Sequence, residues 1–267
     1  MTTDGYGQAL QLDWVDGDVA WARLIRPNEL NTISLEVIEA LGRALDDAQA
    51  KNARAFVITG EGRAFCAGAQ LKYFTDKASP IGSTPVDYRD RYVGPICRLF
   101  DRLEAMAFPT IAAINGYALG GGFELALACD FRIMASTARL GLPEVKVGII
   151  PAGGGVQKLM RFVGRARALD IVLTGRSIEA EEAERLGLVT AVAAPEQLEG
   201  AVAALIEQLK GGGPRAIAQA KLAVYRSEAV DPRSARDFGL EAMTVLMSTT
   251  DFAEGVSAFV EKRKPNW

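Results

Sequence analysis

Two glutamates stand in stretches that otherwise consist mainly of apolar residues and glycine. Glu124 follows three consecutive glycines and is surrounded by leucine, alanine and phenylalanine, and Glu144 follows Pro143 in a second stretch punctuated by glycine. A charged side chain is rarely buried without a partner or a task, because removing it from water is costly. Two carboxyl groups that face one cavity can divide the roles of general base and general acid. The two glutamates are therefore candidates for acid–base catalysis.

Each glutamate also has a purely structural interpretation. Glu124 could form an ion pair with Arg132, and a Pro-Glu pair such as Pro143-Glu144 often opens a helix or turn at the surface. For Glu124, an apolar pocket would raise the pKa, whereas a place in the first turn of a helix would favour the carboxylate form. These two effects together could poise Glu124 as a base.

The glycines at 120–122 predict a turn that can hold an anion. Glycine lets the backbone approach a ligand closely. If a helix begins near Gly121, its first N–H groups have no partner within the helix, and the helix dipole favours negative charge there. The alternative is a close-packed turn without a ligand, since tight strand-to-helix turns are common.

The sequence contains no histidine, which excludes several kinds of site at once. Ser-His-Asp and Cys-His catalysis, HExxH zinc sites and His-ligated metals are all ruled out. Acid–base work must fall to Glu, Asp, Lys, Tyr or Cys. The three cysteines, Cys66, Cys97 and Cys129, are odd in number and set in apolar surroundings. They indicate small core residues and not a disulfide frame or a metal site.

A Gly-x-Gly at 60–62 follows an expected strand and invites a dinucleotide interpretation. The signal is weak, because Phe65 occupies the position of the third glycine and no clear amphipathic helix follows. No P-loop motif is present.

Composition describes an ordinary globular protein. The 267 residues are 49% hydrophobic and 24% charged, enough to bury a sizeable core. A net charge of −3 gives no reason to expect nucleic acid. No apolar run approaches the roughly 18 residues of a membrane span. Residues 1–18 lack the features of a signal peptide or a mitochondrial transit peptide, so we expect a cytoplasmic protein without a membrane partner.

Short apolar runs alternate with helical patterns along the first part of the chain, which predicts an α/β fold. A helix is expected after Ser34, a good N-cap residue. The segment 72–92 mixes prolines, glycines and charges without a clear period, and we expect much of it to be a mobile loop near a site. The runs bounded by Gly, Pro or Asp predict strands at 19–25, 54–59, 110–114 and 131–135.

Helical periodicity replaces the strand signals from about Pro195. The predicted organisation is an α/β core at 1–194 and a helical C-terminal subdomain at 195–267. An apolar stripe in this subdomain fits either intramolecular core or an oligomer contact. It consists of Leu240, Met243, Leu246 and Met247.

Five segments, in this order, resemble the enoyl-CoA hydratase/isomerase, or crotonase, family. The resemblance covers nearly the whole chain. It implies a crotonase-like spiral of ββα units, followed by helices that build a homotrimer, usually doubled to a homohexamer. It also implies an acyl-CoA thioester substrate, with no metal or redox cofactor, because coenzyme A is part of the substrate. The segments are Leu30–Ile33, Arg63–Ala69, Asn115–Glu124, Pro143–Gly155 and Glu261–Pro265.

The resemblance also implies roles for individual residues. The backbone N–H groups of Ala69 and Gly121 would form an oxyanion hole for the thioester oxygen, worth about 3–4 kcal/mol per donor. Glu124 would activate water, and Glu144 would deliver a proton to Cα. Hydratases carry both glutamates, whereas isomerases generally keep only the one that matches Glu144, so the pair favours hydration.

Five further residues are expected to contact the substrate. Ala67, Gln70 and Leu71 flank the oxyanion alanine, and Gln70 replaces the Asp that many family members carry, which leaves the pocket polarity and acyl preference open. Phe259 and Lys262 match family positions that reach the adenosine and phosphate end of coenzyme A on a neighbouring subunit. Lys262 fits a solvated basic tail equally well.

These observations favour hydration of a 2-enoyl-CoA, or dehydration of a 3-hydroxyacyl-CoA. The alternatives are a double-bond isomerase, a specialised lyase of the same superfamily, and an inactive acyl-CoA-binding or scaffold subunit. Acyl length and branching depend on the segment 72–92, which the sequence pattern does not define.

Overall fold

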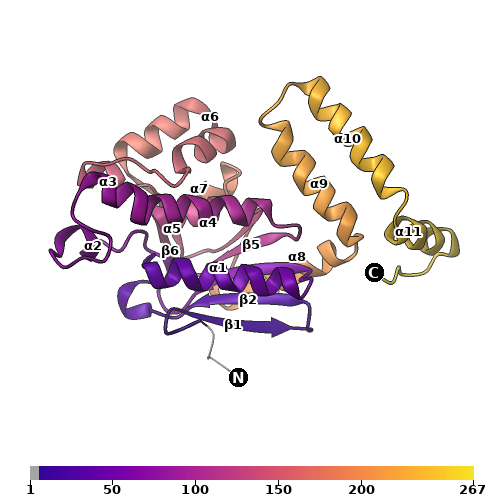
Figure 1. Ribbon diagram of the computed structural model, residues 1–267, viewed down its shortest axis with the longest axis horizontal. Coiled ribbons are helices and arrows are strands. Elements are labelled where there is room, and N and C mark those ends of the chain that lie inside the picture. The colour runs from indigo at the N-terminus through magenta and orange to yellow at the C-terminus, as the bar shows by residue number, and fades with distance from the viewer. Residues whose placement is uncertain (1–5) are drawn as a thin grey trace.

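The computed structural model describes residues 6–267 as two sheets surrounded by helices (Figure 1). Residues 1–5, the start of the segment for which no leader peptide is expected, lie outside the described residues.

The larger sheet contains the four predicted strands, which confirms those predictions. It begins with an antiparallel hairpin, and the remaining neighbours pair in parallel. Its two central strands, β3 and β5, are buried at every position, as is usual for parallel strands covered on both faces. The order is β1 (Leu10–Val15), β2 (Val19–Leu24), β3 (Ala55–Gly60), β5 (Thr110–Ile114), β7 (Phe131–Ala135) and β10 (Ala191–Ala193).

A second sheet is built from strands of three residues each. Three of them follow directly on strands of the larger sheet, so that β3–β4, β5–β6 and β7–β8 each lead into helical structure. This threefold repetition confirms the predicted spiral of ββα units. The short strands are, in sheet order, β4 (Ala64–Cys66), β6 (Tyr117–Leu119), β8 (Arg139–Gly141) and β9 (Ser177–Glu179).

Helix α1 begins where the local sequence provides a start signal. The Ser34 side chain accepts a hydrogen bond from the Val37 N–H at 3.2 Å, which confirms it as the N-cap of α1. Helix α5, which carries Glu124, contacts β4, β6 and α6. The core helices are α1 (Leu35–Ala50), α4 (Gly94–Ala105), α5 (Gly121–Leu127), α6 (Gly155–Thr174) and α7 (Ala180–Arg185).

The segment 72–92 is more ordered in secondary structure than its sequence indicates. Residues 76–84 are irregular, but α2 (Lys72–Thr75) and α3 (Pro85–Tyr88) are helical, and a π-helical turn at Arg89–Val93 leads into α4. The loop prediction is wrong for these parts. In α3, Pro85, taken as a breaker, stands in the first turn, and the Thr84 side chain caps the helix by accepting from the Asp87 N–H.

The C-terminal region is helical, as predicted, but its helices differ in burial. Helix α8 packs on β5 and β7 through three buried aliphatic residues, whereas α9 and α10 contain no buried residue. Figure 1 shows α9 and α10 as a pair that projects from the body of the molecule, with α11 beyond it. The helices are α8 (Leu198–Lys210), α9 (Pro214–Ser227), α10 (Pro232–Leu246) and α11 (Thr250–Glu261).

The apolar stripe on the C-terminal helices is not intramolecular core. Leu240, Met243 and Met247 are each more than half exposed.

None of the helices within residues 6–267 combines the length and the apolar character that a membrane crossing requires.

Candidate active site

Glu124 lies in the first turn of α5 and is 4% exposed. Its Oε1 accepts a hydrogen bond from the Gly155 N–H at 2.8 Å, and the Gly153 N–H also donates to its carboxylate. A Cβ at either glycine would come within 2.8 Å of a carboxylate oxygen of Glu124. The glycines at the start of α6 therefore leave room for the Glu124 side chain, because they have no side chain of their own. No local pattern in the sequence marks this feature.

The ion pair between Glu124 and Arg132 does not form. Arg132 instead donates to backbone carbonyls, among them those of Leu188 at 2.6 Å and Cys129 at 2.7 Å. Burial raises the pKa of Glu124, while the two backbone donors and the positive charge of Lys158 act in the opposite direction. Glu124 is thus a buried carboxyl held by N–H groups that favour its ionised form.

Glu144 begins the 3-10 turn Glu144–Val147, directly after Pro143. The Pro-Glu pair does open a turn, but the side chain is half-buried, and its Oε2 is buried and has no hydrogen-bond partner among the described residues. Its Oε1 lies 2.9 Å from the position of a Cβ built on Gly120, at the start of α5. Buried polar atoms without a partner are rare in folded proteins, and such an atom here indicates a place for a ligand or a reacting group.

Burial raises the pKa of Glu144 to about 7, and the charge of Glu124 contributes in the same direction. The structure therefore brings the two predicted acids together at the N-terminal end of α5 and gives them different environments. Near neutral pH, Glu144 is poised to carry or release a proton.

The segment carrying Ala69 lies beside the first residue of α5. A Cβ at Gly68, whose φ is 96°, would come within 3.2 Å of the Gly121 nitrogen, and a Cβ at Gly121 would lie 3.8 Å from the Ala69 nitrogen. Apart from the hydrogen bonds of regular helices and strands, the Ala69 N–H and the Gly121 N–H donate to no backbone carbonyl within residues 6–267. The two nitrogens therefore lie in one place, at the end of α5 where the helix dipole is positive.

The other residues expected near the oxyanion segment have distinct environments. Ala67 is half-buried and its N–H donates to the Leu30 carbonyl at 3.0 Å. Leu71 is 58% exposed. The Gln70 side chain donates to Glu29 Oε2 at 2.7 Å, so it is turned away toward a neighbouring pocket.

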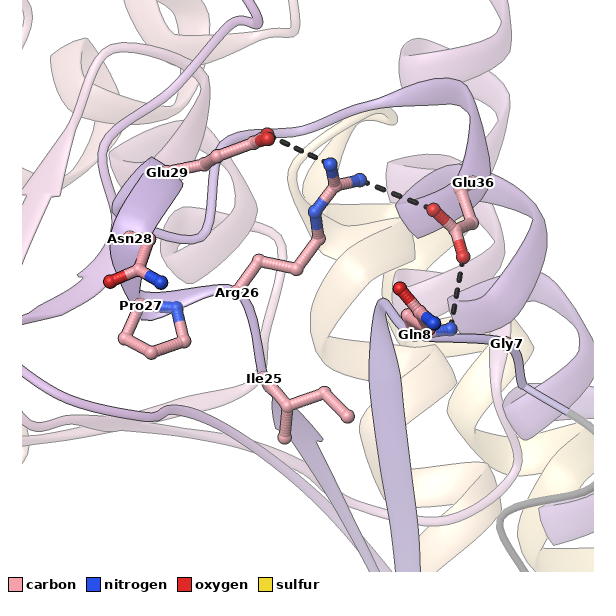
Figure 2. A pocket seen from close by; sticks show the side chains of 8 residues that line it. All are labelled: Gly7, Gln8, Ile25, Arg26, Pro27, Asn28, Glu29 and Glu36. Carbon is pink, nitrogen blue, oxygen red and sulfur yellow. Dashed lines mark hydrogen bonds and ion pairs between the residues drawn. The ribbon is translucent and has the colours of Figure 1, made fainter.

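That pocket is a cavity of about 780 Å³ in which Arg26 lies between two carboxylates (Figure 2). Arg26 pairs with Glu29 at 2.9 Å and with Glu36 at 3.2 Å. These charged residues are not among the predicted site residues, although the sequence carries a signal for them in the Arg-Pro pair directly after an expected strand. The hydrogen bond from Gln70 to Glu29 connects this pocket to the residue that follows Ala69.

Phe259 and Lys262 are not brought to the two glutamates within this chain. Phe259 is 86% exposed on α11, and Lys262 ends that helix in a left-handed conformation. Figure 1 shows α11 at the opposite end of the molecule from α2 and α3.

Two of the three cysteines are core residues as expected, since Cys66 and Cys129 are buried. Cys97 is only partly buried, and its Sγ lies 3.4 Å from the Ala152 carbonyl oxygen.

In the part of the chain that the structure describes, no three acidic or cysteine side chains form a group that could hold a metal ion.

The chain is similar to known proteins along almost its whole length. A family model described as enoyl-CoA hydratase/isomerase matches residues 15–267. A probable enoyl-CoA hydratase of Mycobacterium bovis is 37% identical over 258 residues, which cover 94% of this chain and 95% of that protein. The short-chain-enoyl-CoA hydratase of Clostridium acetobutylicum is 35% identical over 252 residues, with 93% and 94% covered.

The fold is also similar to that of solved structures. The crystal structure of an enoyl-CoA hydratase from Bacillus anthracis aligns with a TM-score of 0.91 at 38% identity, over 97% of this chain and 99% of that one. The chain therefore belongs to the enoyl-CoA hydratase/isomerase family.

Proposed function

We propose that this protein is an enoyl-CoA hydratase, which adds water across the 2,3 double bond of a 2-enoyl-CoA and catalyses the reverse dehydration. The observation that carries the proposal is the pair of carboxyls at the start of α5, one held by backbone N–H groups and one with an unpartnered oxygen and a pKa of about 7. Relatives named as enoyl-CoA hydratases support the same chemistry.

In the proposed mechanism, the thioester oxygen accepts hydrogen bonds from the Ala69 and Gly121 N–H groups. Negative charge develops on this oxygen as the enolate forms, and donors fixed in advance stabilise that charge without reorganising. The positive end of the α5 dipole acts in the same direction.

The two glutamates then divide the proton transfers. Glu124, ionised and oriented by Gly153 and Gly155, takes a proton from the attacking water. Glu144, in its protonated form, delivers a proton to Cα. Only protons and water move, so the chemistry requires no redox cofactor. Dehydration follows the same steps in reverse, with the proton on the other carboxyl.

Double-bond isomerisation is the alternative within the family, and it needs only one acid. A panel of 2-enoyl-CoA thioesters of varied length and branching distinguishes the two reactions, because hydration removes the absorbance of the conjugated thioester. Migration of the double bond in a 3-enoyl-CoA would instead create that absorbance. Turnover of 3-enoyl-CoA without hydration of any 2-enoyl-CoA would contradict the proposal.

We further propose that the chain assembles as a trimer or a hexamer through its C-terminal helices. Apolar side chains remain exposed there, including Phe259 at 86% and Val260 at 73%, beside an apolar groove of about 670 Å³ between α9, α10 and α11. Exposed apolar area of this kind is typical of interaction sites. A single species of 28.6 kDa in sedimentation equilibrium would contradict assembly and also a coenzyme A site shared through Phe259 and Lys262.

A further inference from the structure

A buried tyrosine hydroxyl lies against the backbone that carries the Ala69 N–H. Tyr92 belongs to the π-helical turn before α4 and is 1% exposed. Its hydroxyl accepts a hydrogen bond from the Gln70 N–H at 2.8 Å and donates one to the Ile33 carbonyl oxygen. The segments around Ile33 and Gln70, which also pair directly through a bridge between Ile33 and Ala69, are thus linked a second time through this oxygen atom.

These bonds fix the peptide groups on both sides of Ala69. The peptide before it is held at the Gly68 carbonyl, which accepts from the Ile33 N–H at 2.8 Å. The peptide after it is held at the Gln70 N–H by Tyr92. With both neighbouring peptides fixed, the backbone rotations of Ala69 are fixed as well, and so is the direction of its N–H.

We propose that Tyr92 is a positioning residue for the oxyanion hole. Its hydroxyl clamps the peptide after Ala69 to Ile33 and so keeps the Ala69 N–H in the direction that the bond between Ile33 and Gly68 gives it. This inference rests on the proposed oxyanion role of Ala69. Tyr92 acts through the backbone and does not touch the substrate.

The surroundings of Tyr92 suit this role. The ring packs edge to face against Tyr73, with centroids 5.4 Å apart, and against Phe74 at 5.7 Å, both from α2. Burial raises the pKa of Tyr92, so the hydroxyl keeps its proton and remains a donor. A hydroxyl can accept and donate at the same atom, which a phenylalanine at this position could not do. π-Helical turns are frequent at functional sites.

The test is Tyr92→Phe, which keeps the ring and removes both hydrogen bonds. Complete loss of one oxyanion donor costs about 10²–10³-fold in kcat. A misdirected donor should cost less, and we expect kcat for 2-enoyl-CoA hydration to fall about tenfold with KM changed less than about twofold, the pattern of an interaction made mainly in the transition state. The matched control is Tyr73→Phe, because the Tyr73 hydroxyl accepts from the Leu35 N–H at 3.3 Å, at the first residue of α1, and does not bond the peptide that follows Ala69. Its kcat should stay near that of the wild type.

A spectroscopic measurement separates positioning from a general loss of structure. A saturated acyl-CoA labelled with ¹³C at the thioester carbonyl cannot react, and its infrared carbonyl band moves to lower frequency when the oxygen accepts strong hydrogen bonds. The band of the label bound to Tyr92→Phe should lie closer to that of the free thioester than the wild-type band does. The Tyr73→Phe band should match the wild type.

A folded Tyr92→Phe with wild-type kcat, or with reduced kcat and an unmoved band, would overturn the proposal. If that variant does not fold, 3-fluorotyrosine at position 92 keeps the ring and hydroxyl but makes the oxygen a weaker acceptor, and a band identical to that of the wild type would then overturn it. A wild-type protein that neither hydrates enoyl-CoA nor shifts the band would contradict the proposed function itself. Normal wild-type behaviour with an unaffected Tyr92→Phe contradicts only the role of Tyr92.

Discussion

The two carboxyl groups at the start of α5 are chemically alike, but their surroundings differ in one decisive respect. The Glu124 carboxylate has backbone donors from Gly153 and Gly155 and a lysine nearby, whereas Glu144 has a buried oxygen without any partner in the described chain. Burial raises the pKa of both side chains. At Glu124 the N–H donors of Gly153 and Gly155 and the charge of Lys158 oppose this effect, whereas at Glu144 the only opposing contact is with its own backbone, and the charge of Glu124 adds to the rise. The environment therefore favours the ionised form at Glu124 more than at Glu144, whose pKa lies at about 7.

The largest expected effect follows from removing either carboxyl. Glu124→Gln and Glu144→Gln should each lower the hydration rate by roughly 10²–10⁴-fold, the usual scale for a general acid or base. The double variant should lose less than the product of the single losses, because both groups act on one transition state. Steady-state kinetics with a 2-enoyl-CoA measures this. Glu181→Gln, at a side chain that is 93% exposed, is the control and should be unchanged.

The same variants can contradict the proposed division of roles between Glu124 and Glu144. If Glu124→Gln hydrates at nearly the wild-type rate while Glu144→Gln is inactive, the division of roles is wrong and a single-acid, isomerase-like mechanism is the better account.

The next effect concerns the backbone donor between the two acids. Gly121→Pro removes the N–H at the first position of α5, where proline fits a helix, and should lower kcat by about 10²–10³-fold with the fold retained by circular dichroism. Gly121→Ala is the matched variant, since it keeps the N–H and adds a Cβ that would lie 3.1 Å from Ile33 Cδ1. Gly121→Ala should be the more active of the two, and the opposite order would exclude this N–H as a donor.

The pH dependence gives a sharper test of the two charge states. Hydration needs one proton on the pair, so kcat/KM should fall tenfold per pH unit above the Glu144 pKa of about 7, and fall again in acid once Glu124 is also protonated. Hydration consumes no net proton, so kcat/KM for dehydration must show the same pH profile. Glu144→Gln should lose the alkaline limb. A rate that rises through pH 7 to a plateau would mean that Glu144 acts ionised, as in a single-base isomerase.

The smallest expected effect comes from the charge of Lys158, which acts on the pKa of Glu124. Lys158, paired with Glu104, lowers the pKa of Glu124 by its charge. Lys158→Met should move the acid limb of the kcat/KM profile to higher pH, by less than about one unit. Glu104→Gln leaves the lysine charge unopposed and should move the limb to lower pH. Shifts of the same sign in both variants would indicate a disturbed fold instead of a changed charge.

The sequence alone determined the parts of this protein that depend on neighbouring residues. Apolar runs predicted β2, β3, β5 and β7, and the Ser34 cap predicted the start of α1. Three glycines followed by a lone acid predicted a helix start that could hold an anion, because unpaired N–H groups at a helix terminus are a local property.

The tertiary structure alone decided which of several possible partners each side chain has. Arg132 was an equally good local partner for Glu124, but the fold uses it to bind carbonyls, and glycines some thirty residues away hold the carboxylate instead. The three-residue strands of the second sheet are too short to show a period, so no pattern marked them. Gln70 and Tyr92 meet only because the fold brings the π-helical turn Arg89–Val93 against the oxyanion segment. Contacts between distant segments depend on topology, and a local sequence pattern records burial and propensity but not which surfaces will meet.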